Sequence, residues 1–268
     1  MKINVLSCND SEIKFLLEGV KPDFAGELRR IMLTEVPTMA IEWVDFIRND
    51  SAMPDEIIAN RLGQVPLTFD AKAYNLPSEC KCEGKGCSQC QVKISLKKKG
   101  PDVVYASDLK SNASDVVPVH ERIPIVELFE DQDIEFNAIA QLGLGTEHAK
   151  WQAAVVGYKN VPTISVANLK DEKNAQLLES MCPKHVFKIS DKKVTIPDPT
   201  DCDMCMRCVE AVRRGEVKGE VKVQPVEDSF FFNVETASGV KPDEIVSRAA
   251  EILEKKMAEF GKAVKKLK

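Results

Sequence analysis

The sequence is poor in several residue types that particular functions need. It has three histidines in 268 residues, and aromatic residues make up only 6%. No apolar run approaches the roughly 18 residues that cross a membrane, and Met1-Lys2-Ile3-Asn4 does not begin an apolar signal region. Basic residues number 37 against 42 acidic ones, for a formal charge of −5. We expect a cytoplasmic protein without membrane association that does not grip nucleic acid by itself.

Catalytic patterns are also missing. Gly143-Leu144-Gly145 is weak evidence for a dinucleotide loop, because His148 occupies the third glycine position and no βαβ pattern follows. The other two histidines do not pair with His148 into a metal site, so a structural role is expected for it. The sequence has neither a P-loop nor the clustered aspartates of a metal-dependent polymerase centre. We therefore predict no catalytic site on this chain.

Cysteine, in contrast, is abundant: there are nine. Structural disulfides are rare in the cytoplasm, so this number points to metal binding. Eight of the cysteines form two sets of four, and Cys8 is left over. Cys8 ends an alternating apolar stretch, which predicts a small buried side chain without chemistry.

The first set is a dense loop that runs from Cys80 through Cys82 and Cys87 to Cys90. Its spacing, C-x-C-x4-C-x2-C, allows four thiolates to close a tetrahedral shell around zinc. Gly84 and Gly86 ease the folding of the backbone around an ion. Four protein ligands leave no open coordination position, which predicts a structural zinc. The alternative is a loop of reduced thiols without metal.

The second set combines Cys182-Pro183 with Cys202, Cys205 and Cys208, which are spaced C-x2-C-x2-C. Bacterial-type ferredoxins use C-x2-C-x2-C-x3-C-P, and the last cysteine ligates the other cluster. This pattern predicts one 4Fe–4S cluster held by all four cysteines, or a 3Fe–4S cluster if Cys182 is out of reach. Zinc and an empty site are the alternatives. The positions where ligands of a second cluster would fall hold other residues: Glu172, Ala175, Leu178 and Val212.

Hydrophobic periodicity predicts an α+β fold. The expected elements are paired strands in 1–18 with a turn at Asn9-Asp10, a helix from Lys21 to before Pro37, strands at 41–48 and 133–140, a hairpin tip at 97–101, and a helix from Val240 to the end of the chain. The last helix carries an apolar stripe longer than one small domain needs. We expect a partner to cover part of this stripe, although an ordinary core helix is the simpler alternative.

Three passages carry a family resemblance. Asp23–Ile41, Asp55–Leu67 and Glu147–Trp151 resemble signature segments of the α-type assembly subunits of RNA polymerase. The loop at 80–90 is similar to the zinc loop of the eukaryotic third-largest subunit, and the second cysteine set resembles the ferredoxin-like insert of archaeal members. The resemblance covers nearly the whole chain.

The resemblance implies an α-type dimerisation domain formed by residues 1–48 and 226–268. A mostly-β domain would be inserted at 49–164, and it would itself be interrupted by a ferredoxin-like domain at 165–225. It also implies a heterodimer with the small α-like subunit L. The predicted interface consists of apolar residues on the first and last helices: Phe24, Leu28, Ile31, Met32, Ile252, Met257 and Phe260.

The implied function is a non-catalytic one. Pairing with subunit L would nucleate assembly of the large catalytic subunits of DNA-dependent RNA polymerase, and contact with DNA would be made through the complex. The iron–sulfur cluster would be structural, or would sense redox state. A ferredoxin-type electron carrier is the alternative function, supported by the C-x2-C-x2-C motif alone.

Overall fold

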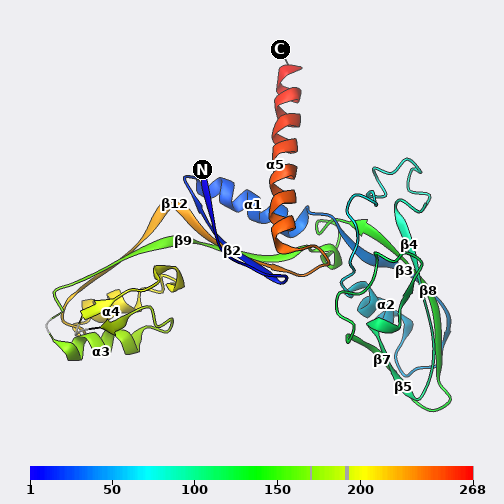
Figure 1. Cartoon of the computed structure of the whole chain (residues 1–268), viewed down its shortest axis with the longest axis horizontal. Coiled ribbons are helices and arrows are strands. Elements are labelled where there is room, and N and C mark those ends of the chain that lie inside the picture. Colours follow the sequence, from blue (N-terminus) through cyan, green and yellow to red (C-terminus); the bar gives the residue numbers. More distant parts are fainter. Residues whose placement is uncertain (170, 191–192, 268) are drawn as a thin grey trace. The chain divides into compact units, whose positions relative to one another are not determined.

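The computed structural model describes residues 1–169, 171–190 and 193–267 (Figure 1). Its strands are β1 (Lys2–Cys8), β2 (Glu12–Glu18), β3 (Thr38–Asn49), β4 (Gln91–Lys99), β5 (Asp102–Tyr105), β6 (Lys110–Ser111), β7 (Pro124–Leu128), β8 (Asp133–Gly143), β9 (Ala154–Ala167), β10 (Lys188–Ser190), β11 (Lys193–Thr195) and β12 (Glu220–Thr236). Its α-helices are α1 (Pro22–Thr34), α2 (Asp55–Gly63), α3 (Glu172–Met181), α4 (Arg207–Arg213) and α5 (Pro242–Lys265). This mixture of strands and helices confirms the predicted α+β class.

The chain divides into two compact units. Unit 1 comprises Met1–Ser7, Lys14–Gly26 and Gly157–Asn233. Unit 2 comprises Cys8–Ile13, Glu27–Val156 and Val234–Lys268. The boundaries predicted at 164/165 and 225/226 fall inside the long strands β9 and β12 rather than in linkers. The three-domain division stays a prediction.

Unit 1 is built on a sheet with the strand order β1-β2-β12-β9. Its core is aromatic: the ring of Phe15 stacks on Phe232 with centroids 5.0 Å apart, and Tyr158 stacks on Phe232 at 5.2 Å. All seven residues of the edge strand β1 are exposed, Cys8 among them. The prediction of a buried Cys8 is therefore wrong. The alternating pattern predicted the strand correctly, but no described part of the chain buries β1.

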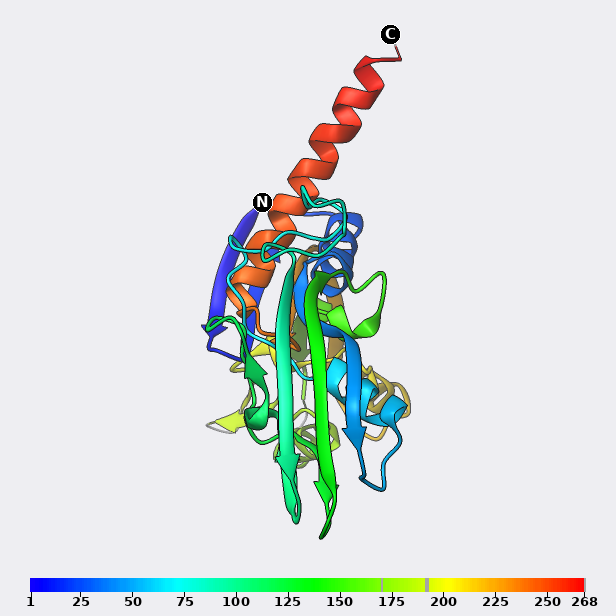
Figure 2. The same cartoon turned by 90° about the vertical axis from the view of Figure 1, so that its right-hand side faces the viewer.

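Unit 2 contains a second antiparallel sheet, ordered β3-β8-β4-β6. Figure 2 shows β3, β8 and β4 side by side. Val92, Ile94 and Leu96 of β4 point to one face and are buried, as the period of two along a strand requires. Helix α2 packs against β3 and contributes the buried Ile58 and Leu62.

The predicted hairpin at 97–101 is wrong. β4 pairs with β8 and β6, whereas β5, which follows the turn, pairs with β7. The segment therefore joins two different sheets. Lys98 turns inward there: its ammonium lies 3.0 Å from a carboxylate oxygen of Asp102 and 2.8 Å from one of Asp108, and it donates to the carbonyl of Val103.

Lys98→Met is expected to destabilise the chain by about 1–2 kcal/mol, because the half-buried Asp108 loses its ionic partner. Burial lowers the pKa of Lys98, but the hydrogen bonds to Asp108 and Asp102 outweigh it and raise that pKa. The stabilisation is therefore present below the ordinary lysine pKa and disappears as pH rises through the raised value. Urea unfolding at neutral and strongly alkaline pH measures it. An equal loss in Lys93→Met, an exposed lysine of the same strand, would contradict this role.

Both predicted long helices are confirmed. α1 begins at Pro22, where proline fits the first turn, and it ends before Pro37. α5 runs for 24 residues from Pro242. Its first half packs inward through Ile245 and Ala249, each 0% exposed. Its second half extends away from the other elements of unit 2 (Figure 1), so the apolar stripe is covered over only part of its length.

Candidate metal centres

The four cysteines of the first set converge as predicted. The Sγ atom of Cys82 lies 3.4 Å from that of Cys80 and 3.5 Å from that of Cys90. The Sγ atom of Cys87 lies 3.5 Å from Cys80 and 3.7 Å from Cys90. A tetrahedron with Zn–S bonds of 2.3 Å has sulfur–sulfur edges of about 3.8 Å. These four distances are close to the edges of such a tetrahedron, and all four sulfurs lie within 4.8 Å of one another, so the group could hold one metal ion.

Local turns produce this geometry. The amide of Glu83 donates to the carbonyl of Cys80, and the amide of Cys90 donates to that of Cys87. Gly86 has φ +86°, and a Cβ there would lie 2.3 Å from Oε1 of Gln91. The positive φ is what favours glycine here, since the amide end of the Gln91 side chain can move aside. The amide of Cys87 also donates to the Cys90 sulfur at 3.3 Å, which stabilises a thiolate there.

The thiols of this loop share protons unequally. Side-chain hydrogen bonding with Cys80 and Cys90 lowers the pKa of Cys82 to about 6. Burial raises the pKa of Cys90 to about 12. Without a cation, sulfurs this close cannot all ionise, because like charges repel. A bound divalent ion replaces the protons between them, so the donor set fits zinc.

The second set of cysteines gathers around a pocket in unit 1. Cys182, Cys202, Cys205 and Cys208 all line it, together with apolar side chains that include Phe187 and Val223. Cys182 caps the C-terminal end of α3, and Cys208 lies in the first turn of α4. Residues 20 or more apart in sequence are thus brought to one site, as predicted.

This second arrangement is wider than the first. Among the described residues, only the Cys80 set places all four sulfurs within 4.8 Å of one another. A single zinc ion needs the tighter spacing, whereas a cluster of several iron atoms holds its cysteines further apart. Burial raises the pKa of Cys202 and of Cys208, and the neighbouring thiolates add to the effect.

Backbone strain is concentrated around this pocket. His185, Met204 and Met206 all have positive φ, between 50° and 62°, although none is glycine. Such conformations persist only where the surroundings impose them, and they are common at ligand sites. The strained turn directs the amide of Met204 to the Cys202 sulfur at 3.3 Å. Lys159 of β9 holds the same loop, since its Nζ donates to the Cys202 carbonyl at 3.1 Å.

The predicted partner surface divides into two groups. Leu28, Ile31 and Met32 are at most 5% exposed, so they belong to the core of this chain and cannot form an accessible surface. That part of the prediction is corrected. Phe24 and Ile252 are half-buried. Met257 is 59% exposed and Phe260 66%, so these two side chains are accessible, and their contact with a partner stays a prediction. An amphipathic pattern cannot tell these two cases apart.

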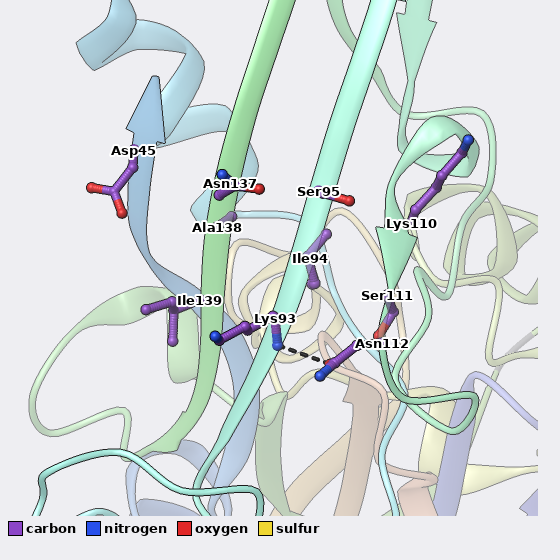
Figure 3. A pocket seen from close by; sticks show the side chains of 10 residues that line it. All are labelled: Asp45, Lys93, Ile94, Ser95, Lys110, Ser111, Asn112, Asn137, Ala138 and Ile139. Carbon is purple, nitrogen blue, oxygen red and sulfur yellow. Dashed lines mark hydrogen bonds between the residues drawn. The ribbon is translucent and has the colours of Figure 1, made fainter. Parts of the chain in front are cut away.

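A further pocket lies on the outer face of the unit 2 sheet, where Asp45, Lys93 and Asn137 project from β3, β4 and β8 (Figure 3). Most of the residues that line it are polar or charged, Ile139 adds apolar surface, and the pocket is open to solvent, as is usual for one face of an antiparallel sheet. His148 has a local structural role, because its Nδ1 accepts the amide hydrogen of Lys150.

Within the described residues, no helix combines the length and apolar character needed to cross a membrane.

Comparison with known proteins identifies the family. Residues 44–174 match the RNA polymerase Rpb3/RpoA insert domain. The chain is 39% identical to DNA-directed RNA polymerase subunit Rpo3 of Methanosphaera stadtmanae, with 96% of each chain covered. It is 36% identical to the Rpo3 subunit of Thermococcus kodakarensis over 100% of this chain and 99% of the relative. The chain belongs to the Rpo3 family of DNA-directed RNA polymerase subunits.

Membership in the Rpo3 family confirms the resemblance seen in the sequence. The chain therefore acts as part of the polymerase complex and assembles with other polymerase subunits. The family extends to eukaryotes: DNA-directed RNA polymerase II subunit rpb3 of Dictyostelium discoideum is 34% identical over 97% of this chain and 93% of the relative. The matched insert domain starts within β3 and ends within α3, beyond both ends of the predicted 49–164 segment.

Proposed function

We propose that this Rpo3-family chain is a non-catalytic assembly subunit that pairs with the small α-like subunit L in the cytoplasm. The observation that carries the proposal is the exposed second half of α5, with Met257 and Phe260 unpartnered by the described chain. Burial of this stripe against a second subunit would create the platform on which the large subunits assemble. DNA would then be contacted through the complex.

Native mass spectrometry tests the pairing. The full chain, co-expressed with subunit L from the same organism and purified without oxygen, is expected to give a 1:1 complex. The same measurement reports bound metal, since one zinc and one iron–sulfur cluster add distinct masses. A chain that stays alone while carrying a cluster would contradict the assembly role and favour the electron carrier, which family membership does not support.

We further propose that Cys80, Cys82, Cys87 and Cys90 hold a structural zinc. The sulfur–sulfur distances of 3.4–3.7 Å support it, because they match the edges of a zinc–thiolate tetrahedron. Four protein ligands leave no position for substrate. The ion would cross-link a loop that otherwise has few regular backbone hydrogen bonds.

Cys82→Ser is expected to lower zinc from about one ion per chain to near zero, because a three-thiolate shell binds much more weakly. Plasma emission spectrometry of the purified chain measures the zinc. Hydrogen exchange is expected to rise in residues 76–90 and to stay unchanged in α5. Ser88→Ala, in the same loop but without a ligand atom, serves as the control. Full zinc content in Cys82→Ser would refute the site.

For the second set we propose one iron–sulfur cluster, 4Fe–4S with Cys182 as a ligand or 3Fe–4S without it. The wider spacing of the sulfurs, the strained turn and the apolar lining support this choice over zinc. When bound, a cluster supplies a cross-link between thiolates and a centre that can change oxidation state. A structural role and a redox-sensing role both fit the site. One result distinguishes the two roles: oxidation of the cluster changes the affinity for subunit L only if the cluster senses redox state.

Lys159→Met is expected to shorten the lifetime of the cluster in air severalfold. The lysine ties the Cys202 loop to β9, and its positive charge lies close to a site that carries several thiolates. Loss of visible absorbance over time measures the lifetime. Lys159→Arg is expected to restore much of it, because arginine also donates. Lys222→Met removes an exposed lysine of β12 and is the control. An equal loss of cluster lifetime in this variant would contradict a specific role of the hydrogen bond from Lys159 to Cys202.

A further inference from the structure

A groove beside the first half of α5 belongs to neither metal centre. It has a volume of about 490 Å³ and lies between α5 and the segment that leads into the zinc loop. Phe69, Leu76 and Ile252 contribute apolar surface to it. We call it the α5 groove. Every residue that lines it belongs to unit 2.

The charge of the α5 groove is unbalanced. Four carboxylates, those of Asp70, Glu79, Glu244 and Glu251, line it together with two cations, Lys72 and Arg248, for a net charge of −2. Arg248 is already engaged, because its guanidinium lies 2.8 Å from a Glu244 oxygen and over the Phe69 ring at 5.9 Å. Of the other carboxylates, that of Asp70 accepts the backbone amide hydrogen of Lys72 at 2.9 Å, and Lys72 is the one further cation among the residues that line the groove.

We propose that the α5 groove binds a segment bearing lysine or arginine from the subunit that covers the exposed stripe of α5. Long cationic side chains suit this site, because their methylene stems pack on apolar surface while their charged ends meet carboxylates. Ile252 lies between the two surfaces: it lines the groove, is itself half-buried, and precedes the exposed Met257 and Phe260 on the same helix. A subunit that lies along the stripe therefore reaches the groove. This inference rests on the proposed pairing with subunit L.

The test measures the affinity of the full-length chain for subunit L by calorimetry. The variant Asp70→Asn/Glu251→Gln removes two groove charges and keeps both side-chain shapes. Binding is expected to weaken about tenfold at low salt. At about 0.5 M salt the difference from wild type is expected to vanish, because exposed charges are then screened. Glu127→Gln/Glu130→Gln removes two exposed charges elsewhere in unit 2 and is expected to bind like wild type.

The outcomes separate this inference from the proposed function. If wild type pairs with subunit L and the groove variant binds equally well at low salt, the groove inference is wrong and the pairing stands. If both double variants weaken binding alike, the effect reflects net charge and the groove is again excluded. If wild type does not bind subunit L, both proposals fall. Thermal unfolding and zinc content, expected to be unchanged, exclude misfolding as a cause.

Discussion

A chain in which Asp replaces Phe260 is expected to pair with subunit L about a hundredfold or more weakly than wild type. Phe260 is 66% exposed, and in the proposed complex its ring enters the apolar interface. Buried aromatic residues contribute most of the energy of such interfaces, and an unpaired carboxylate in the same place adds a desolvation cost. Co-purification and calorimetry measure the loss. The chain itself is expected to unfold at an unchanged temperature, because Phe260 lies outside its core.

Ala258→Asp provides the matched control for this experiment. Ala258 is also exposed on α5, but it lies about 160° around the helix from Phe260. The two variants share the new charge and differ in the face that carries it. Ala258→Asp costs more in helix propensity than Phe260→Asp, because alanine is the better helix former, so normal pairing by Ala258→Asp is the stricter control. Normal pairing by Phe260→Asp, or an equal loss in Ala258→Asp, would show that the stripe is not the contact surface.

The two helices show how far the sequence predicts a partner surface. In both, apolar spacing and proline-marked starts gave the correct position of the helix. The same spacing marks Ile31, which is fully buried by this chain, and Phe260, which is not. Which stretch of an apolar stripe is covered depends on where the neighbouring elements end, and this is a tertiary property. The first half of α5 packs on unit 2 and the second half extends past it.

The cysteines also show that local patterns can be predicted from the sequence, whereas tertiary burial cannot. The convergence of the four cysteines at 80–90 could be predicted, because these residues and the glycines between them all lie within 11 residues; zinc binding by the loop stays a proposal. The second set needed a family pattern to join Cys182 to a motif 20 residues away. The prediction that Cys8 is buried was wrong, because the burial of an edge strand depends on which other elements pack over it. The prediction of a hairpin at 97–101 was wrong for a related reason. Strand β8, more than 30 residues further along the chain, pairs with β4, so β5 does not.

Cys208→Ser is expected to reduce iron from about four atoms per chain to near zero after anaerobic reconstitution. Of the four cysteines in the second set, Cys208 is the most buried, and it packs in a small core with Leu178 and Phe187. Without the cluster, few large apolar side chains are left to hold this region, and bound metal commonly supplies the missing folding energy. Hydrogen exchange is therefore expected to rise across α3 and α4.

The Cys8→Ser variant makes this result specific. It is the same chemical change at an exposed cysteine that lies in β1, away from both cysteine sets in sequence, and iron and zinc contents are expected to stay at wild-type levels. In Cys208→Ser, zinc is expected to remain at about one ion, because the loop at 80–90 supplies its own four ligands. Retention of iron by Cys208→Ser would refute the proposed cluster site. Loss of zinc with retention of iron would show that the two metals had been assigned to the wrong sets.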